Sequence, residues 1–281
     1  MWFAGPRRFR LPGLGSWKDC GMHPSRQCRI TRALFSLACA FTTLAGVVGA
    51  EPKTNGFAVA DFLLAPLRVH LLTATNEPAI HTQLTSNDVV RILGKVNRVW
   101  AQAGVTFYLE SLRTEAASNP TNYAQRAKED ERTTLLSLRP RHSLATNCFH
   151  VFYLHQIQPN GIYFNAQGIF VKDTARLRPV AGGLDEPLPR VTAHELGHAL
   201  TLPHRQDVTN LLASGMSGGW LNTQEIAQAR TAAQQHPWVE PAAALLKRTE
   251  DLQRKGGVDE VRELRRRLSF VPLAGDAGLG R

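Results

Sequence analysis

The stretch VTAHELGHALTLPH, residues 191–204, brings together side chains that can bind a metal ion. His194 and His198 are four residues apart, so on a helix their imidazoles lie on one face, one turn apart. Neutral imidazoles favour Zn²⁺ or a similar borderline ion over Mg²⁺ and Ca²⁺. Glu195 follows the first histidine and would project towards the open side of such an ion. Because zinc acidifies water and a nearby carboxylate can take its proton, this pattern predicts hydrolytic chemistry with Glu195 as the general base.

A catalytic zinc site usually has three protein ligands and one open position. Two residues are candidates for the third ligand: His204, and Glu225 in the helix-forming segment NTQEIAQAR. Pro203 forces the residue before it out of helical geometry and so ends the helix. The chain can then bend and bring His204 to the metal. We therefore predict His204 as the third ligand and Glu225 as a solvent-facing helix residue.

The segment HELGHALTLPH (194–204) resembles the long zinc motif of the metzincin clan of metallopeptidases, H-E-x-x-H-x-x-G-x-x-H. That family also has a tight turn after the third histidine, which places a methionine beneath the metal. Here NLLASGMSGG (210–219) follows at a plausible distance and supplies Met216. The resemblance implies that Met216 is the structural methionine of this turn.

The resemblance extends upstream and covers roughly residues 60–236. VNRVWAQAGVTFYLESL (96–112) is similar to the first helix and second strand of matrixin-like metzincin domains. GIFVKD (168–173) falls where the family has the edge strand that binds an extended peptide by main-chain pairing. The resemblance implies an α+β domain with a small mixed, twisted sheet, an active-site helix and a C-terminal helix below the cleft.

Three residues depart from the family pattern. Thr201 stands in place of the motif glycine, and a β-branched residue at positive φ is costly. Either Pro203 makes the bend while Thr201 keeps an ordinary φ, or the turn is strained. Ser217 follows Met216 where astacin-type members have a tyrosine, so transition-state stabilisation would rest on zinc and the glutamate. Arg205 directly after the third histidine matches no subfamily signature, and we do not predict it to be a ligand.

The surrounding periodicities predict the elements that must position these residues. CFHVFYLHQI (148–157) is apolar on both faces, which predicts a strand in the middle of a sheet, with His150 and His155 in structural roles. The other predicted elements are strands at 67–74 and 105–112, one or two short strands in 161–173, a short helix near 123–138, and helices at 89–104, 189–202 and 222–236. This order of strands and helices also indicates an α+β domain.

The first 50 residues have the pattern of an export signal. Basic residues precede an apolar run at 33–50, which ends in Val48-Gly49-Ala50, a cleavage-like triplet. A membrane anchor is the alternative, since the run is about the minimum length for a span. We favour a removed signal, starting at Met1 or Met22, and hence a secreted or periplasmic protein. Three of the four cysteines lie in this segment, so Cys148 is alone in the mature chain and no disulfide forms within it.

The net charge of +10 is concentrated in that same segment, which carries seven Lys and Arg against one Asp. The remainder shows no basic patch interleaved with aromatic residues, so we do not expect nucleic-acid binding. We expect a peptidase domain at 51–240 without stable membrane insertion, followed by a charged helical tail at 241–281 that is a solvated appendage.

Taken alone, the sequence predicts an exported zinc endopeptidase that acts on proteins or peptides. Two alternatives remain open: a catalytically silent zinc-binding module of the same fold, and an aminopeptidase of narrow specificity. The glutamate argues against the silent module, because binding zinc does not require that residue.

Overall fold

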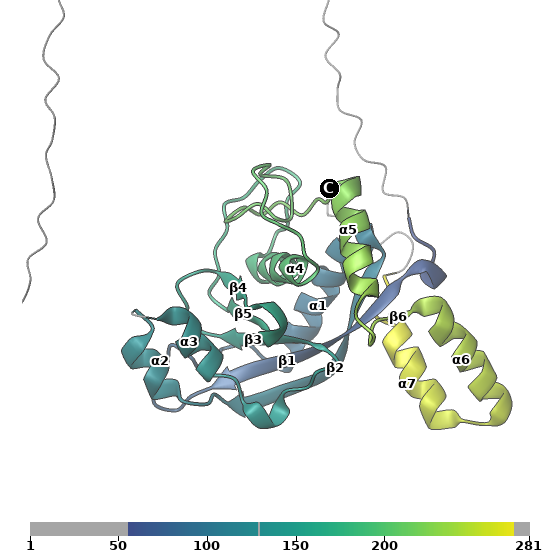
Figure 1. Cartoon of the computed structure of the whole chain (residues 1–281), viewed down its shortest axis with the longest axis horizontal. Helices are drawn as coiled ribbons and strands as arrows, with labels where there is room; N and C mark the ends of the chain where they lie inside the picture. Colours follow the sequence, from purple (N-terminus) through teal and green to yellow (C-terminus); the bar gives the residue numbers. More distant parts are fainter. Residues whose placement is uncertain (1–55, 129, 273–281) are drawn as a thin grey trace, which may run out of the picture. The chain divides into compact units, whose positions relative to one another are not determined.

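A mixed sheet lies at the centre of the computed structural model, which describes residues 56–128 and 130–272 (Figure 1). In these residues the sheet has six strands. Their order is β2 (Val105–Ala116), β1 (Leu63–Thr73), β3 (Phe149–Leu154), β5 (Ile169–Lys172) and β4 (Gly161–Tyr163), with β6 (Glu240–Pro241) paired to the start of β1. The first four run parallel, whereas β4 and β6 are antiparallel to their partners. The predicted α+β class with a small mixed sheet is confirmed, and β3 lies in the middle as expected.

The predicted export signal at 1–50 lies outside the described residues, as do both candidate start methionines and three of the four cysteines. Within the described part, no helix is both long enough and apolar enough to cross a membrane.

One face of the sheet carries the main apolar core. Leu67, Val69 and Leu71 alternate along β1, as their spacing predicts, and point into this core. Three helices cover the face: α1 (Ser86–Trp100), α4 (Pro187–Ala199) and α5 (Thr223–Gln234). Helix α1 begins three residues earlier than predicted because Thr85 and Asp88 form a reciprocal capping box. The helix with the histidines, α4, is thereby packed against both the sheet and α1.

The opposite face of the sheet is covered by the segment between β2 and β3. Leu72, Phe152 and Phe170 point to this side and form a second apolar cluster with Tyr123 and Leu135. The single short helix predicted near 123–138 is in fact two helices, α2 (Pro120–Arg126) and α3 (Glu131–Ser137). Asp130 caps the second helix by accepting from the backbone N–H of Thr133 at 3.0 Å.

The edge strand beside α4 is β4, not the segment 168–173 that the resemblance implied. That segment forms β5, which is hydrogen-bonded to β3 on one side and β4 on the other. The prediction was wrong because Gly168 ends a turn that reverses the chain, so the two short strands in 161–173 pair with each other. The outer side of β4 therefore faces the cleft.

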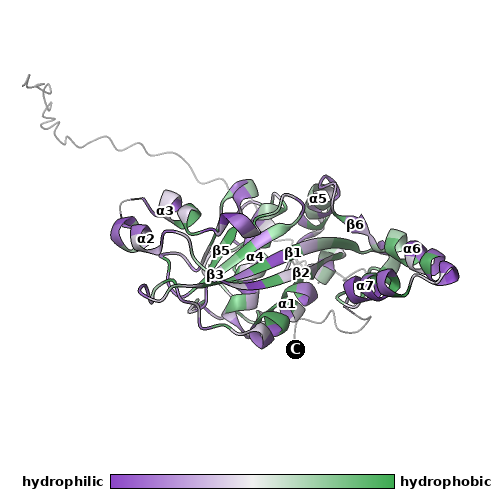
Figure 2. Cartoon of the chain, turned by 90° about the horizontal axis from the view of Figure 1, so that it is seen from below, coloured by the Kyte–Doolittle hydropathy of each residue, from purple (hydrophilic) through white to green (hydrophobic). Residues whose placement is uncertain are grey.

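The C-terminal helices are packed onto the sheet and are more than a solvated appendage. Helices α6 (Ala242–Lys255) and α7 (Val258–Leu268) form a hairpin beyond β6 (Figure 1). Leu245 and Leu264 contribute to a third apolar cluster with Phe62 of the segment before β1. Figure 2 shows hydrophilic residues over much of the remaining hairpin surface. The predicted boundary at residue 241 stays a prediction.

Candidate metal centre

Helix α4 carries His194, Glu195 and His198, and its first turn is held in place by neighbouring residues. Pro187 is the first helical residue, where its missing N–H costs nothing and its φ suits a helix. Glu186 precedes it and is held by Arg91 and by Lys95 of α1, the latter with Nζ 3.1 Å from Oε2. The helix ends at Ala199, slightly before the predicted end.

Three histidines converge on one point beside this helix. Nε2 of His198 lies 3.1 Å from Nε2 of His194 and 3.1 Å from Nε2 of His204. One ligand nitrogen from each ring lies within 4.8 Å of the others, and no other such group of three metal-binding side chains occurs in the described residues. Pro203 and the bend after α4 bring His204 back to the helix, as the sequence predicts.

Two of these rings are oriented by backbone carbonyls. Nδ1 of His194 lies 2.8 Å from the carbonyl oxygen of Leu211, and Nδ1 of His198 lies 2.8 Å from that of Leu202. A carbonyl only accepts, so each Nδ1 carries the proton and each Nε2 keeps its lone pair. Burial also lowers the pKa of both rings, that of His194 to about 3, so both are neutral at neutral pH.

This donor set fits a zinc ion. The Nε2 lone pairs of His194 and His198 face each other across 3.1 Å and repel unless a cation lies between them. Tetrahedral zinc with bonds of ~2.0–2.1 Å to nitrogen has its ligand atoms roughly 3.3 Å apart, close to the spacing found here. Hydrogen bonds from the second ring nitrogen to backbone carbonyls are the usual support of metal-bound histidines.

Thr201 adopts a left-handed backbone conformation. Its φ is +67°, so of the two alternatives the strained turn is the one that occurs. The N–H of Leu202 bonds the carbonyl of Gly197 at 2.9 Å, and the N–H of Thr201 bonds that of His198 at 3.0 Å. These bonds form a Schellman motif, which requires a left-handed residue after the helix cap. Pro203 stops the helix but does not remove this requirement, so the turn is strained.

Glu195 points into the cleft beside the histidines. The cleft has a volume of about 510 Å³ and includes Gly161, Tyr163 and Val191 in its lining. Glu195 is 5% exposed, and burial raises the pKa of its carboxyl group to about 8, while the nearby charge of Arg190 lowers it. A Cβ atom at Gly161 would lie 2.9 Å from Oε1 of Glu195, so β4 packs directly against this side chain.

Arg190 is a buried component of the site that the sequence analysis missed. It is 1% exposed, and its Nη1 lies 3.1 Å from Nδ1 of His194; because that nitrogen donates to Leu211, this is a contact between two N–H groups and not a hydrogen bond. The guanidinium donates to the carbonyls of Gly218 and Ala213, tying α4 to the loop that follows the third histidine. Its position four residues before His194, on the same helix face, is a signal that could have indicated this role.

Glu225 is not solvent-facing as predicted, but completely buried. Its Oε1 accepts from Nε of Arg205 at 2.5 Å, and its Oε2 accepts from Nδ2 of Asn210 at 2.8 Å. The cause is long-range: the residue after the third histidine supplies a charge partner 20 positions earlier in the chain. Glu225 is not part of the histidine group.

The loop after the third histidine approaches α4 through its leucines. Leu211 holds His194 through its carbonyl, and Leu212 is fully buried, with Cδ1 3.2 Å from where a Cβ of Gly197 would lie. Met216 is half-buried, and its backbone bridges to Arg178. Its role as the structural methionine beneath the metal stays a prediction.

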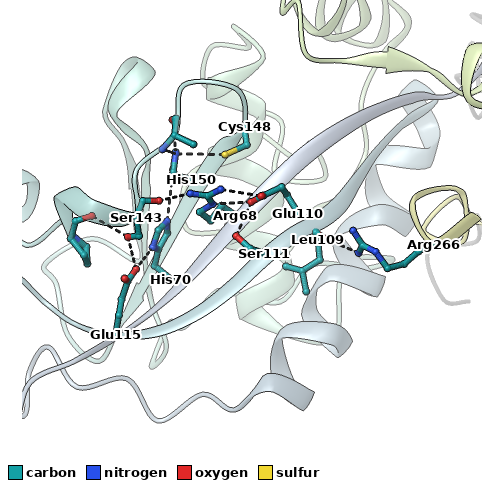
Figure 3. A network of polar contacts seen from close by, with 12 residues as sticks. Arg68, His70, Leu109, Glu110, Ser111, Glu115, Ser143, Cys148, His150 and Arg266 are labelled. Carbon is teal, nitrogen blue, oxygen red and sulfur yellow. Dashed lines mark hydrogen bonds and ion pairs between the residues drawn. The ribbon is translucent and has the colours of Figure 1, made fainter. Parts of the chain in front are cut away.

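A second polar cluster lies on the sheet face opposite α4 (Figure 3). His70 is fully buried, with Nδ1 2.5 Å from Oε1 of Glu115 and Nε2 2.9 Å from Nδ1 of His150. His150 also contacts the backbone of Ala145 and the thiol of Cys148, whose pKa is raised to about 11 by burial. These groups form a chain across three strands and do not converge on one point, which agrees with the structural role predicted for His150.

Comparison with known proteins gives distant likenesses among solved structures only. No family model matches the chain, and no curated protein matches it. Among solved structures, that of mirolysin in complex with compound 9 is similar, with a TM-score of 0.42 and 11% sequence identity, over 61% of this chain and 91% of that chain.

Proposed function

We propose that this protein is an exported zinc-dependent endopeptidase of the metzincin type. The observation that carries the proposal is the convergence of three histidine Nε2 atoms beside a buried glutamate in one cleft. His194, His198 and His204 would hold the ion. When bound, zinc supplies Lewis acidity, which lowers the pKa of water towards ~7 and polarises a carbonyl oxygen.

Glu195 performs the proton transfers in this proposal. Its carboxylate takes the proton of the attacking water and later gives it to the amine of the departing peptide. The raised pKa suits a group that must both accept and release a proton near neutral pH. Arg190 beside it favours the ionised form that acts first.

The edge strand β4 offers a place for the substrate. Among the described strands it is hydrogen-bonded only to β5, so the backbone groups of Gly161 and Tyr163, which point away from β5, can pair with an extended peptide on the cleft side. Such pairing recognises main chain and not one particular side chain. A protein or peptide substrate is therefore the class that we propose.

Purified mature protein incubated with denatured casein, and with capped and free-amine peptides, tests this function. We expect cleavage of casein and of capped peptides, and a fall of about 10²–10⁴-fold in kcat/KM for Glu195→Ala. Cleavage of free-amine peptides only would indicate an aminopeptidase. Zinc binding without cleavage would indicate the silent module, and unchanged activity of Glu195→Ala would refute the mechanism.

The proposed export rests on the pattern of residues 1–50. N-terminal sequencing of the protein recovered outside the cytoplasm should begin at Glu51. Retention of the apolar run in the membrane fraction would favour the anchor instead.

A further inference from the structure

His204 differs from the other two histidines in how it is held. Its side chain is exposed, and in the described residues its Nδ1 forms no hydrogen bond, whereas the Nδ1 atoms of His194 and His198 bond backbone carbonyls. Its ring therefore depends on the chain on either side of it for its position. Pro203 before it restricts one side. The other side is fixed by Arg205.

Arg205 is anchored through both its backbone and its side chain. Its N–H bonds the carbonyl of Leu212 at 3.1 Å, and its backbone bridges to Ala213. Its Nε reaches Oε1 of Glu225 at 2.5 Å. The residue next to His204 is thereby fastened both to the loop that follows it and to helix α5.

Glu225 is a fully satisfied buried carboxylate. Besides Arg205, it accepts from Nδ2 of Asn210 at 2.8 Å and from the backbone N–H of Asn222 at 2.9 Å. Asn210 in turn accepts from the N–H of Leu212 at 2.7 Å. Removing one partner of such a buried pair leaves the other charge uncompensated, so the pair has one strongly favoured arrangement.

We propose that the Arg205–Glu225 ion pair is a positioning device that holds His204 at the metal, so that Glu225 acts on the site without binding the ion. The inference rests on the proposed zinc site. It assigns a function to the two residues that stand outside the motif, and it makes helix α5 the support of the third ligand.

The test measures zinc affinity by competition with a chromophoric chelator, and the visible absorption of the Co²⁺-loaded protein. We expect Arg205→Met and Glu225→Gln each to weaken zinc binding about 10–100-fold and to change the Co²⁺ spectrum. The double variant should bind zinc no more weakly than the single variant with the lower zinc affinity. Arg205→Lys keeps the charge and should recover most of the affinity.

Two further variants separate positioning from general loosening of the fold. Arg230→Met removes another anchor of α5, the bonds from Nη1 to the carbonyls of Ala103 at 2.8 Å and Gly104 at 3.0 Å, and should leave zinc affinity unchanged. In a His204→Ala background, adding Arg205→Met should have no further effect, because the ligand that it positions is already gone.

The outcomes are distinguishable. Wild-type zinc affinity and spectrum in both Arg205→Met and Glu225→Gln would overturn the inference while leaving the zinc site intact. The inference would also be overturned if Arg205→Met lowered zinc affinity as much in the His204→Ala background as in the wild type. Failure of the wild type to bind zinc would refute the proposed function itself. Arg205 is partly exposed whereas Glu225 is fully buried, so we expect Arg205→Met to disturb the fold less than Glu225→Gln, and its zinc affinity tests the inference even if Glu225→Gln unfolds.

Discussion

Thr201 adopts a backbone conformation that is energetically unfavourable for threonine. A non-glycine residue at φ +67° crowds its own Cβ, and a β-branched one does so more than alanine. A hydrogen bond offsets part of this strain: Nε2 of Gln228 donates to the carbonyl of Thr201 at 2.7 Å. The left-handed turn is therefore made with a threonine, and its strain lowers the stability of the fold.

Thr201→Gly should raise the free energy of unfolding by about 1 kcal/mol, because glycine has no penalty in the left-handed conformation. The greater freedom of glycine in the unfolded chain offsets part of this gain. Urea unfolding measures this change. Thr201→Ala keeps a Cβ and should gain less. A loss of stability in Thr201→Gly would show that the threonine is itself stabilising.

His70 should make the fold sensitive to acid. Burial lowers its pKa to about 4, so between pH 6.5 and 4 the unfolded chain binds a proton that the folded chain does not. The free energy of unfolding therefore falls as pH drops through this window, by about 2–3 kcal/mol from this residue. NMR titration of the His70 ring checks the cause: a midpoint between pH 6 and 7 would contradict it.

At the scale of elements, the cleft depends on how closely β4 packs on α4. A Cβ at Gly161 would lie 2.6 Å from Cγ1 of Val191 and 2.9 Å from Cγ of Glu195. Only glycine lets the strand come this near the glutamate. The edge strand and the helix thus set the position of Glu195 together.

Gly161→Ala should lower kcat/KM by about tenfold or more, because the added methyl group displaces Glu195 or β4 by a fraction of an ångström. Zinc content should stay unchanged, since the histidines are not touched. Gly94→Ala is the matched control, with nothing within 4 Å of its Cβ. Full activity of Gly161→Ala would show that the close approach is not needed.

The α6–α7 hairpin should behave as part of the folded core. Leu245 is 1% exposed, so Leu245→Ala should cost about 2–4 kcal/mol of stability without changing zinc affinity. The neighbouring Leu246 is less buried and provides the control. Equal effects of the two substitutions would show that the hairpin is only loosely attached.

At the scale of the whole molecule, the parts predictable from sequence were those set by local spacing. Four-residue spacing on a helix indicated that His194 and His198 share a face, and the proline indicated that the helix ends before His204. The left-handed turn at Thr201 was not predicted. Features decided by distant partners were not predictable in the same way. Glu225 is buried because Arg205 reaches it, and β4 is the edge because its partner strand inserts beside β3.

The zinc content of the purified protein after dialysis, compared between the wild type and His204→Ala, decides whether three histidines hold a zinc ion. We predict one zinc ion per wild-type chain. In His204→Ala we predict a large loss of bound zinc, because two imidazoles and solvent remain as ligands. A wild type without zinc, or a His204→Ala variant that retains zinc as tightly, would contradict the three-histidine site.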